Sequence, residues 1–139
     1  MRKSIYKIII VCLVFCTMAV PVFAESARVT KDYQTRFTNI NVFMNHLEIS
    51  DSGKASVTTH INGRDCDQVK VVAYLQQYKD GQWKTIKSWS ETSEGTIGGI
   101  GKSYYVMSGN SYRLKSYGYV YGEGKLLDKT SYVGDTIKY

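Results

Sequence analysis

The dipeptide Asp80-Gly81 narrows the range of possible folds more than any other feature, because it separates two runs of strand-forming residues. Residues 68–78 are rich in strand-forming side chains, and residues 83–90 contain two tryptophans, an isoleucine and a threonine. An Asp-Gly pair in this setting is the strongest short-range signal for a two-residue β-hairpin. The first run is predicted to bury the face formed by Val69, Val71, Ala73 and Leu75.

Similar alternating runs and turn signals continue along residues 38–139, at intervals of about ten residues. One of these runs is predicted to bury Ala55, Val57, Thr59 and Ile61. No stretch sustains the apolar period of a helix. The pattern therefore predicts an all-β fold, an immunoglobulin-like or fibronectin-like antiparallel β-sandwich of seven to eight strands.

The first of these runs has an irregular period. Ile40, Val42 and Met44 lie at every second position, and the apolar positions then change phase at Asn45-His46 before Leu47 and Ile49. One extra residue in an alternating strand is typical of a β-bulge. The sequence therefore predicts a bulge at Asn45-His46.

The segment around Tyr112 resembles a tyrosine corner. Val106 lies six residues before Tyr112, a Ser-Gly-Asn turn lies between them, and Leu114 follows two residues later. Immunoglobulin-like and fibronectin-like sandwiches use this spacing to pack a tyrosine ring at the core edge while its hydroxyl bonds the backbone just upstream. Tyr112 is therefore predicted to be a core residue that begins an inward-facing row.

Two tryptophans on the return strand of the hairpin are the other predicted aromatic core residues. Ser116 and Gly118 share the predicted inward face of Tyr112 and would leave a hollow there. Because protein interiors are close-packed, a large side chain should fill it, and Trp83 or Trp89 is the expected one. Their spacing with Ile86, three residues each way, breaks strict alternation, so at least one is expected beside a bulge or at an edge.

The N-terminal residues have the pattern of an export signal. A basic start is followed by an apolar run at residues 8–20, then by Pro21 and small residues up to Ala24. This predicts a signal peptide at residues 1–24, a polar spacer at residues 25–37 and one domain at residues 38–139, secreted and extracellular or associated with the cell wall. No membrane span is expected after signal removal, and 15 basic and 12 acidic residues would remain, a net charge of +3.

Cys66 is the one cysteine that remains after the predicted cleavage, so no internal disulfide is expected. It lies between Asp65 and Asp67, whose negative charges should raise the pKa of its thiol and reduce its reactivity. An unreactive loop thiol is expected rather than a nucleophile or a disulfide bridge between two copies of the chain.

The outward face of the strand that contains Tyr112 is the candidate binding surface. Its members are two cations and three phenols that alternate along one side: Arg113, Lys115, Tyr117, Tyr119 and Tyr121. Aromatic rows beside cations can stack on sugars, aromatic ligands or peptides. The alternative is that these tyrosines pair with neighbours across the strands and brace the sheet.

Patterns that would indicate catalysis or a cofactor are missing from the sequence. No serine-nucleophile motif, phosphate-binding loop or HExxH is found. His46, His60 and Cys66 match no metal-site spacing, and no run of basic residues is dense enough for nucleic acid. We therefore expect no enzyme activity, no cofactor, no metal and no nucleic-acid partner.

Three segments together resemble a known family. They are LQ-x-Y-x-D-G-x-W-x-x-I-x-x-W at residues 75–89, SGNSYRLK at residues 108–115 and YVYGEGK at residues 119–125. They are similar to a family of small secreted β-sandwich proteins of Gram-positive bacteria, catalogued as a domain of unknown function. The resemblance implies an export signal and a β-sandwich over about residues 38–132, and it implies no activity or site residues.

Two functions from different classes fit these observations. The first is a secreted non-catalytic β-sandwich module that binds a cell-envelope polymer or an extracellular protein or glycan. The second is a secreted bacteriocin-like antagonist of neighbouring cells. The sequence favours the binding module, because residues 25–139 contain nothing like a membrane-inserting helix.

Overall fold

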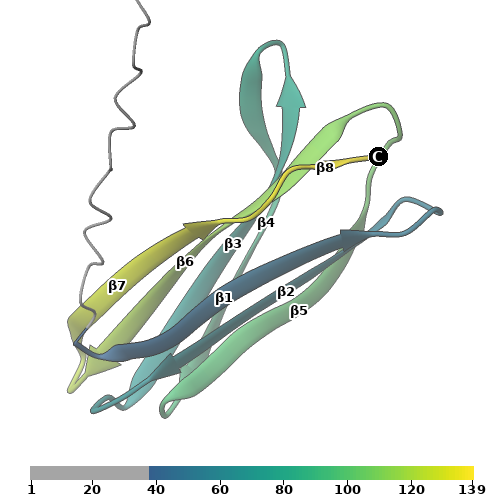
Figure 1. The fold of residues 1–139 in the computed structure, drawn as a ribbon. Helices are drawn as coiled ribbons and strands as arrows, with labels where there is room; N and C mark the ends of the chain where they lie inside the picture. Colours follow the sequence, from purple (N-terminus) through teal and green to yellow (C-terminus); the bar gives the residue numbers. More distant parts are fainter. Residues whose placement is uncertain (1–37) are drawn as a thin grey trace, which may run out of the picture. The chain divides into compact units, whose positions relative to one another are not determined.

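The computed structural model of the protein describes residues 38–139 (Figure 1). The predicted signal peptide at residues 1–24 and the predicted spacer at residues 25–37 lie outside the described residues. Within residues 38–139 the chain consists of β-strands joined by turns and loops, and no helix is present there.

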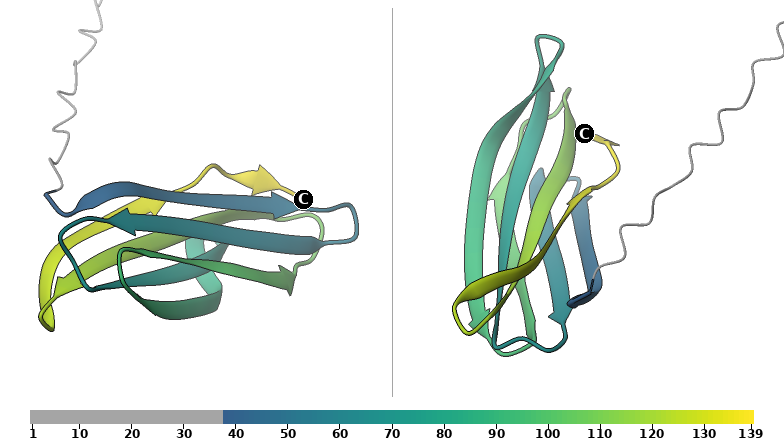
Figure 2. Two further views of the ribbon diagram at one scale, coloured as in Figure 1. Left: turned by 90° about the horizontal axis from the view of Figure 1, so that it is seen from below. Right: turned by 90° about the vertical axis from the view of Figure 1, so that its left-hand side faces the viewer.

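Eight strands form two antiparallel sheets that face each other as separate layers (Figures 1 and 2). The strands are β1 (Ile40–Ile49), β2 (Lys54–Gly63), β3 (Gln68–Lys79), β4 (Gln82–Glu94), β5 (Ile97–Tyr105), β6 (Ser111–Gly122), β7 (Lys125–Val133) and β8 (Ile137–Lys138). One sheet has the order β1-β2-β5, and the five-stranded sheet has the order β4-β3-β6-β7 with β8 also paired to β6. The predicted all-β sandwich of seven to eight strands is confirmed.

The strand order also bears on the finer prediction of an immunoglobulin-like topology. If β1 to β3 are taken as strands A to C and β5 to β7 as E to G, the sheets contain the A-B-E and C-F-G groupings of immunoglobulin-type sandwiches. The strand β4 stays beside β3 at the edge of the same sheet. The immunoglobulin-like or fibronectin-like assignment itself stays a prediction.

The core lies between the layers and is supplied mainly by three strands that bury every second residue, β2, β3 and β6. The buried side chains on β2 and β3 are the ones that alternation predicts: Ala55, Val57, Thr59, Ile61, Val69, Val71, Ala73 and Leu75. On β6 they are Tyr112, Leu114, Ser116, Gly118 and Val120. A continuous apolar layer of this kind provides the main driving force for folding.

The predicted bulge in β1 is at a different position. Register with β2 is continuous from Val42 to Ile49, and the irregularity lies between Ile40 and Val42, so the prediction at Asn45-His46 is wrong. The apparent change of phase arises because the apolar residues Val42 and Met44 point outward and are exposed, while Asn45, a polar residue, points inward. Its Nδ2 donates to Ser116 Oγ at 2.8 Å. A polar inward residue with hydrogen-bond partners thus resembles a bulge when only the sequence is read.

A bulge does occur on β4, and it explains the tryptophan spacing. Pairing of β3 with β4 shifts between Leu75 and Gln76, where Ile86 is the extra residue. Trp89 therefore lies opposite the buried Ala73 and packs against the core, whereas Trp83 lies opposite Tyr78 on the other side of the sheet. The prediction of core packing is confirmed for Trp89, which is partly buried, and is wrong for Trp83.

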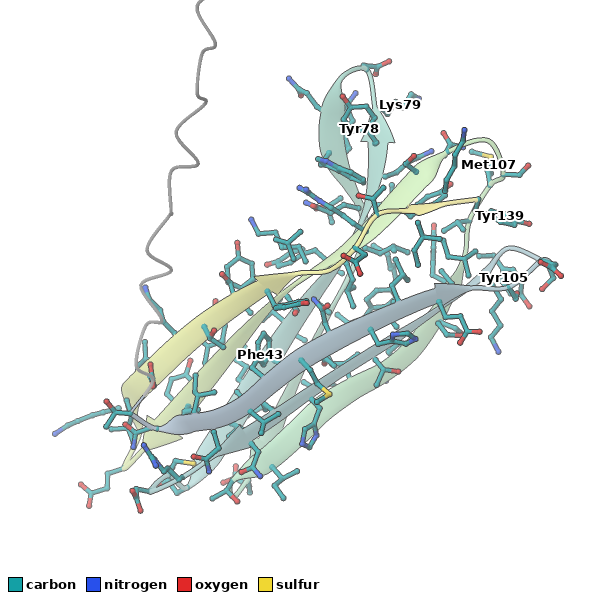
Figure 3. All side chains as sticks on the ribbon, in the orientation of Figure 1. Phe43, Tyr78, Lys79, Tyr105, Met107 and Tyr139 are labelled. Atoms are coloured by element: carbon teal, nitrogen blue, oxygen red, sulfur yellow. The ribbon has the colours of Figure 1, made fainter. Side chains whose placement is uncertain are left out.

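The hollow at Gly118 is filled from the facing sheet and not by a tryptophan. A Cβ added to Gly118 would lie 2.8 Å from both Ile61 Cδ1 and the ring of Phe43. Figure 3 shows Phe43 between the two sheets. Two side chains of the three-stranded sheet thus take the place that the sequence analysis gave to Trp83 or Trp89.

The hairpin turn has the predicted geometry. Asp80 and Gly81 have φ values of 55° and 76°, so both central residues are left-handed, as a type I′ turn requires. The tip of the hairpin extends past the neighbouring strands and carries Tyr78 and Lys79 (Figure 3).

The tyrosine corner is present as predicted. Tyr112 is 1% exposed, and its hydroxyl donates to the Met107 carbonyl oxygen at 2.7 Å. The bond fixes the connection between β5 and β6 and gives the buried hydroxyl a partner. The pKa of Tyr112 is raised, chiefly by burial.

We expect Tyr112→Phe to lower the free energy of unfolding by about 1 kcal/mol, because it removes one hydrogen bond and keeps the ring. Tyr112→Ala should cost about 3–5 kcal/mol, since it also leaves a cavity. Urea unfolding followed by tryptophan fluorescence measures both values. Equal losses for the two variants would contradict the assignment of the ring to the core.

The two tryptophans should differ in the same measurement, followed by far-UV circular dichroism. Trp89→Ala should cost about 3 kcal/mol, because its ring packs against the core. Trp83→Ala should cost about 1 kcal/mol, the scale of the aromatic and cation–π contacts that it makes outside the core. A larger loss for Trp83 than for Trp89 would contradict the effect assigned to the bulge at Ile86.

Candidate binding face

The five predicted surface residues of β6 all lie on the solvent-facing side of the five-stranded sheet, which we call the outer face. The pattern along β6 alternates strictly between buried and half-buried positions, and the half-buried ones include Arg113, Lys115, Tyr117, Tyr119 and Tyr121. They are half-buried rather than fully exposed because β6 is a central strand, flanked by β3 on one side and by β7 and β8 on the other.

The neighbouring strands add residues to the outer face that were not predicted from the sequence. Directly paired residues share a face, so the register with β6 identifies them. The strand β3 contributes Lys70, Val72, Tyr74, Gln76 and Tyr78. The edge strand β4 contributes mainly hydroxyl side chains, namely Thr85, Ser88, Ser90 and Thr92. The edge strand β7 contributes Ser131 together with Leu126, Lys129 and Val133. The sequence did place the even-numbered residues of β3 on its outward side. It did not show that β3 pairs with β6, so these residues could not be assigned to the same face as the row on β6.

Positive charge is concentrated on the outer face. The outward positions of its strands carry five cations, Lys70, Arg113, Lys115, Lys129 and Lys138, against a single carboxylate, Glu94. The Glu94 carboxylate accepts a hydrogen bond from the Gln68 amide at 3.0 Å. The ion pairs found within residues 38–139 are Lys84–Asp80 and Lys102–Glu91, so none of the five cations is paired with a carboxylate.

Arg113 is held in place at the hairpin end of the outer face. Its Nε donates to Gln76 Oε1 at 2.9 Å. Its guanidinium carbon lies 4.2 Å from the centre of the Trp83 ring, a cation–π distance. The Trp83 ring in turn packs against Tyr78, with 5.2 Å between ring centres. Trp83, predicted as a core residue, thus orders a cation on the outer face.

Tyrosine rings cover the middle of the outer face. Tyr74 and Tyr117 meet edge to face, with 5.9 Å between ring centres and an angle of 90°. Lys115 Nζ lies 5.3 Å from the centre of the Tyr117 ring. Edge-to-face packing is a favourable aromatic geometry, so these rings both brace the sheet and present a fixed surface.

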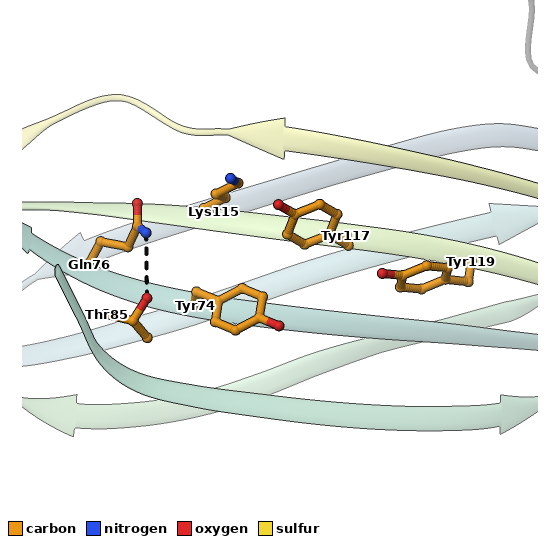
Figure 4. A pocket seen from close by; sticks show the side chains of 6 residues that line it. All are labelled: Tyr74, Gln76, Thr85, Lys115, Tyr117 and Tyr119. Carbon is orange, nitrogen blue, oxygen red and sulfur yellow. Dashed lines mark hydrogen bonds between the residues drawn. The ribbon is translucent and has the colours of Figure 1, made fainter. Parts of the chain in front are cut away.

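A depression of about 300 Å³ lies among these side chains (Figure 4). It is lined by Tyr74, Gln76, Thr85, Lys115, Tyr117 and Tyr119. The Gln76 amide spans it toward the Thr85 hydroxyl at 3.5 Å. The depression thus offers aromatic rings, amide and hydroxyl groups and one ammonium group to a ligand.

The Tyr119 hydroxyl remains protonated at neutral pH. Burial, and then the neighbouring phenols of Tyr74, Tyr121 and Tyr117, raise the pKa of Tyr119. A phenol in this state can donate a hydrogen bond, and it adds no negative charge to the outer face.

A second depression, of about 220 Å³, lies where β1 approaches β7 and β8. It is lined by Asn45, His46, Leu47, Tyr132, Gly134, Asp135 and Ile137. Asn45 Oδ1 is the one buried side-chain polar atom without a hydrogen-bond partner in the described chain, while Asn45 Nδ2 also donates to the Tyr132 carbonyl at 3.2 Å. We regard this amide mainly as a polar connection between the sheets.

The residues considered for a metal do not form a group. His46 and His60 project from the outer surface of the β1–β2 pair, where His46 lies opposite Thr58 and His60 opposite Met44. They are therefore diagonal neighbours on this pair of strands. Cys66 lies on the β2–β3 loop. Within residues 38–139, no three His, Cys, Asp or Glu side chains are placed to hold a metal ion together.

The thiol of Cys66 has the predicted electrostatic environment. Burial is the largest cause that raises its pKa, followed by the negative charges of Asp67 and Asp65. Cys66 forms no disulfide.

Iodoacetamide should therefore alkylate Cys66 in the folded protein more slowly than in the urea-unfolded protein at pH 8, because less thiolate is present. Asp65→Asn should speed the folded reaction by removing one of the negative charges. Mass spectrometry of quenched samples gives both rates. A folded rate equal to or above the unfolded rate would contradict the raised pKa.

No protein-family model matches the sequence, and no curated protein matches it. The resemblance to a family of small secreted proteins therefore stays a prediction. Along residues 38–139, no helix has the length and apolarity needed to cross a membrane.

Proposed function

We propose that the protein is a secreted, non-catalytic β-sandwich module that binds a cell-surface or extracellular partner through the outer face. The observation that carries the proposal is the collection of cations, aromatic rings and hydroxyl groups on this one side of the five-stranded sheet. Exposed surfaces that combine tyrosine, tryptophan and arginine are typical of recognition sites.

The form of the outer face supports a surface contact. Its depression is shallow and is lined by side chains of three adjacent strands, β3, β4 and β6. Small-molecule sites usually enclose most of their ligand, whereas this depression is open to solvent on one side of the sheet. The predicted export signal places such a surface outside the cell, where envelope polymers and extracellular proteins are the available partners.

The rigidity of the outer face also supports binding. Arg113 is fixed by Gln76 and Trp83, and Tyr117 is fixed by Tyr74 and Lys115. Side chains that are ordered before binding lose less conformational entropy when a partner arrives. The contacts that brace the sheet therefore also prepare it for recognition.

The double variant Tyr117→Ala/Tyr119→Ala should lose retention on isolated cell walls or whole cells, because it removes the aromatic centre of the outer face. Its unfolding free energy should fall by no more than about 2 kcal/mol, since strand propensities differ by about 1 kcal/mol per position. Tyr105→Ala/Tyr132→Ala is the matched control, because these tyrosines are 69% and 49% exposed and lie off the outer face. Pull-down followed by quantitative gel analysis measures retention.

Full retention by the Tyr117→Ala/Tyr119→Ala variant would overturn the proposal for this face. Growth inhibition of neighbouring bacteria by the purified protein would instead support the bacteriocin-like alternative. Both assays can use the same preparation, so binding without inhibition and inhibition without wall binding are separate outcomes.

A further inference from the structure

We infer that the partner of the outer face is a linear anionic glycan, a sugar polymer that carries repeated negative groups. This inference rests on the proposed function, because it names the chemical class of the partner that the module would bind. Four features of the outer face carry it: uncompensated charge, the arrangement of the cations, the mixture of ring and hydroxyl groups, and the open shape.

The charge comes first. Lys70, Lys115 and Lys129 share the outer face, and none of them has a carboxylate partner in the described chain. Carboxylates elsewhere do pair with lysines, as Asp80 does with Lys84 at 2.8 Å. Neighbouring like charges repel one another, and a bound polyanion would relieve that repulsion.

The cations also form an extended pattern. Lys70 and Lys129 lie directly opposite Tyr119 on the two neighbouring strands, so their Cα atoms are about 10 Å apart across the sheet. Arg113 and Lys115 follow along β6, with same-face residues spaced about 7 Å apart. The positive surface therefore runs about 20 Å along β6, a span that suits a polymer with several charges better than a single small anion.

The groups between the cations suit sugar rings. Tyr74, Tyr117 and Tyr119 present aromatic surface, against which the C–H faces of a sugar can pack. The edge strands supply hydroxyl side chains, which can both donate to and accept from sugar hydroxyls. Aliphatic side chains are few on this face, namely Val72, Leu126 and Val133, whereas the centre of a protein–protein interface is usually apolar.

Paired polymers test the inference with the purified protein. Dextran sulfate and dextran share a backbone and differ in charge, inorganic polyphosphate supplies charge without sugar rings, and poly(dT) supplies charge with nucleic-acid bases. We expect dextran sulfate to bind most tightly and dextran not to bind. The binding constant should fall linearly with salt on a logarithmic scale, because counterions are released.

Two charge-matched variants locate the site. Lys70→Gln/Lys115→Gln should weaken dextran sulfate binding about tenfold and reduce the salt slope by about 2, because two charge contacts are lost. Lys54→Gln/Lys125→Gln removes the same net charge from positions off the outer face and should bind as the unchanged protein does. Isothermal titration calorimetry at several salt concentrations measures affinity and slope together.

Each other result overturns the inference. Equal binding of dextran and dextran sulfate would exclude a role for the charge of the polymer. If the two lysine double variants lose the same affinity for dextran sulfate, the attraction is non-specific and does not depend on the outer face. If polyphosphate binds as tightly as dextran sulfate, the sugar rings make no contribution to binding. If poly(dT) binds more tightly than dextran sulfate, the preferred partner is a nucleic acid. Suppose that no polymer binds, but that the unchanged protein is retained on cell walls and the Tyr117→Ala/Tyr119→Ala variant is not. The proposed function then stands and the anionic glycan is excluded as the partner.

Discussion

The strict alternation of β6 is the constraint on which both the fold and the candidate binding face depend. As a central strand, β6 is hydrogen-bonded on both sides, so its side chains can only point into the sandwich or away from it. The inward set includes Tyr112 with its hydroxyl bonded to Met107, and Gly118, where Phe43 and Ile61 of the facing sheet fill the space. Because these inward residues fix the register of β6, its outward residues must lie on the outer face.

The outer face is therefore a consequence of core packing. Because the inward residues fix β6, its partners β3 and β7 bring Lys70 and Lys129 opposite Tyr119. The bulge at Ile86 adds a second effect, since it turns Trp83 to the outer face while Trp89 stays against the core. One inserted residue thus converts an expected core aromatic into a support for Arg113.

Local patterns were sufficient where the chemistry is local. The Asp80-Gly81 turn needs left-handed residues, the faces of β2 and β3 follow apolar alternation, and the tyrosine corner depends on a five-residue separation between Tyr112 and Met107. The outward row of β6 follows from the same alternation. The bulge in β1 was misplaced because Val42 and Met44 are apolar at outward positions and Asn45 is polar at an inward one. The partner that satisfies Asn45, Ser116, lies 71 residues away.

The sequence by itself determined the number of strands to within one, the main turns between them and which side of each regular strand faces the core, because these depend on neighbours within a few residues. Only the tertiary structure decided which strands lie side by side, where the bulges fall and what fills the space above Gly118. Those outcomes depend on pairing and packing between distant segments. The clustering of lysines and tyrosines from β3, β6 and β7 belongs to this second group, since it exists only once the strands are in register.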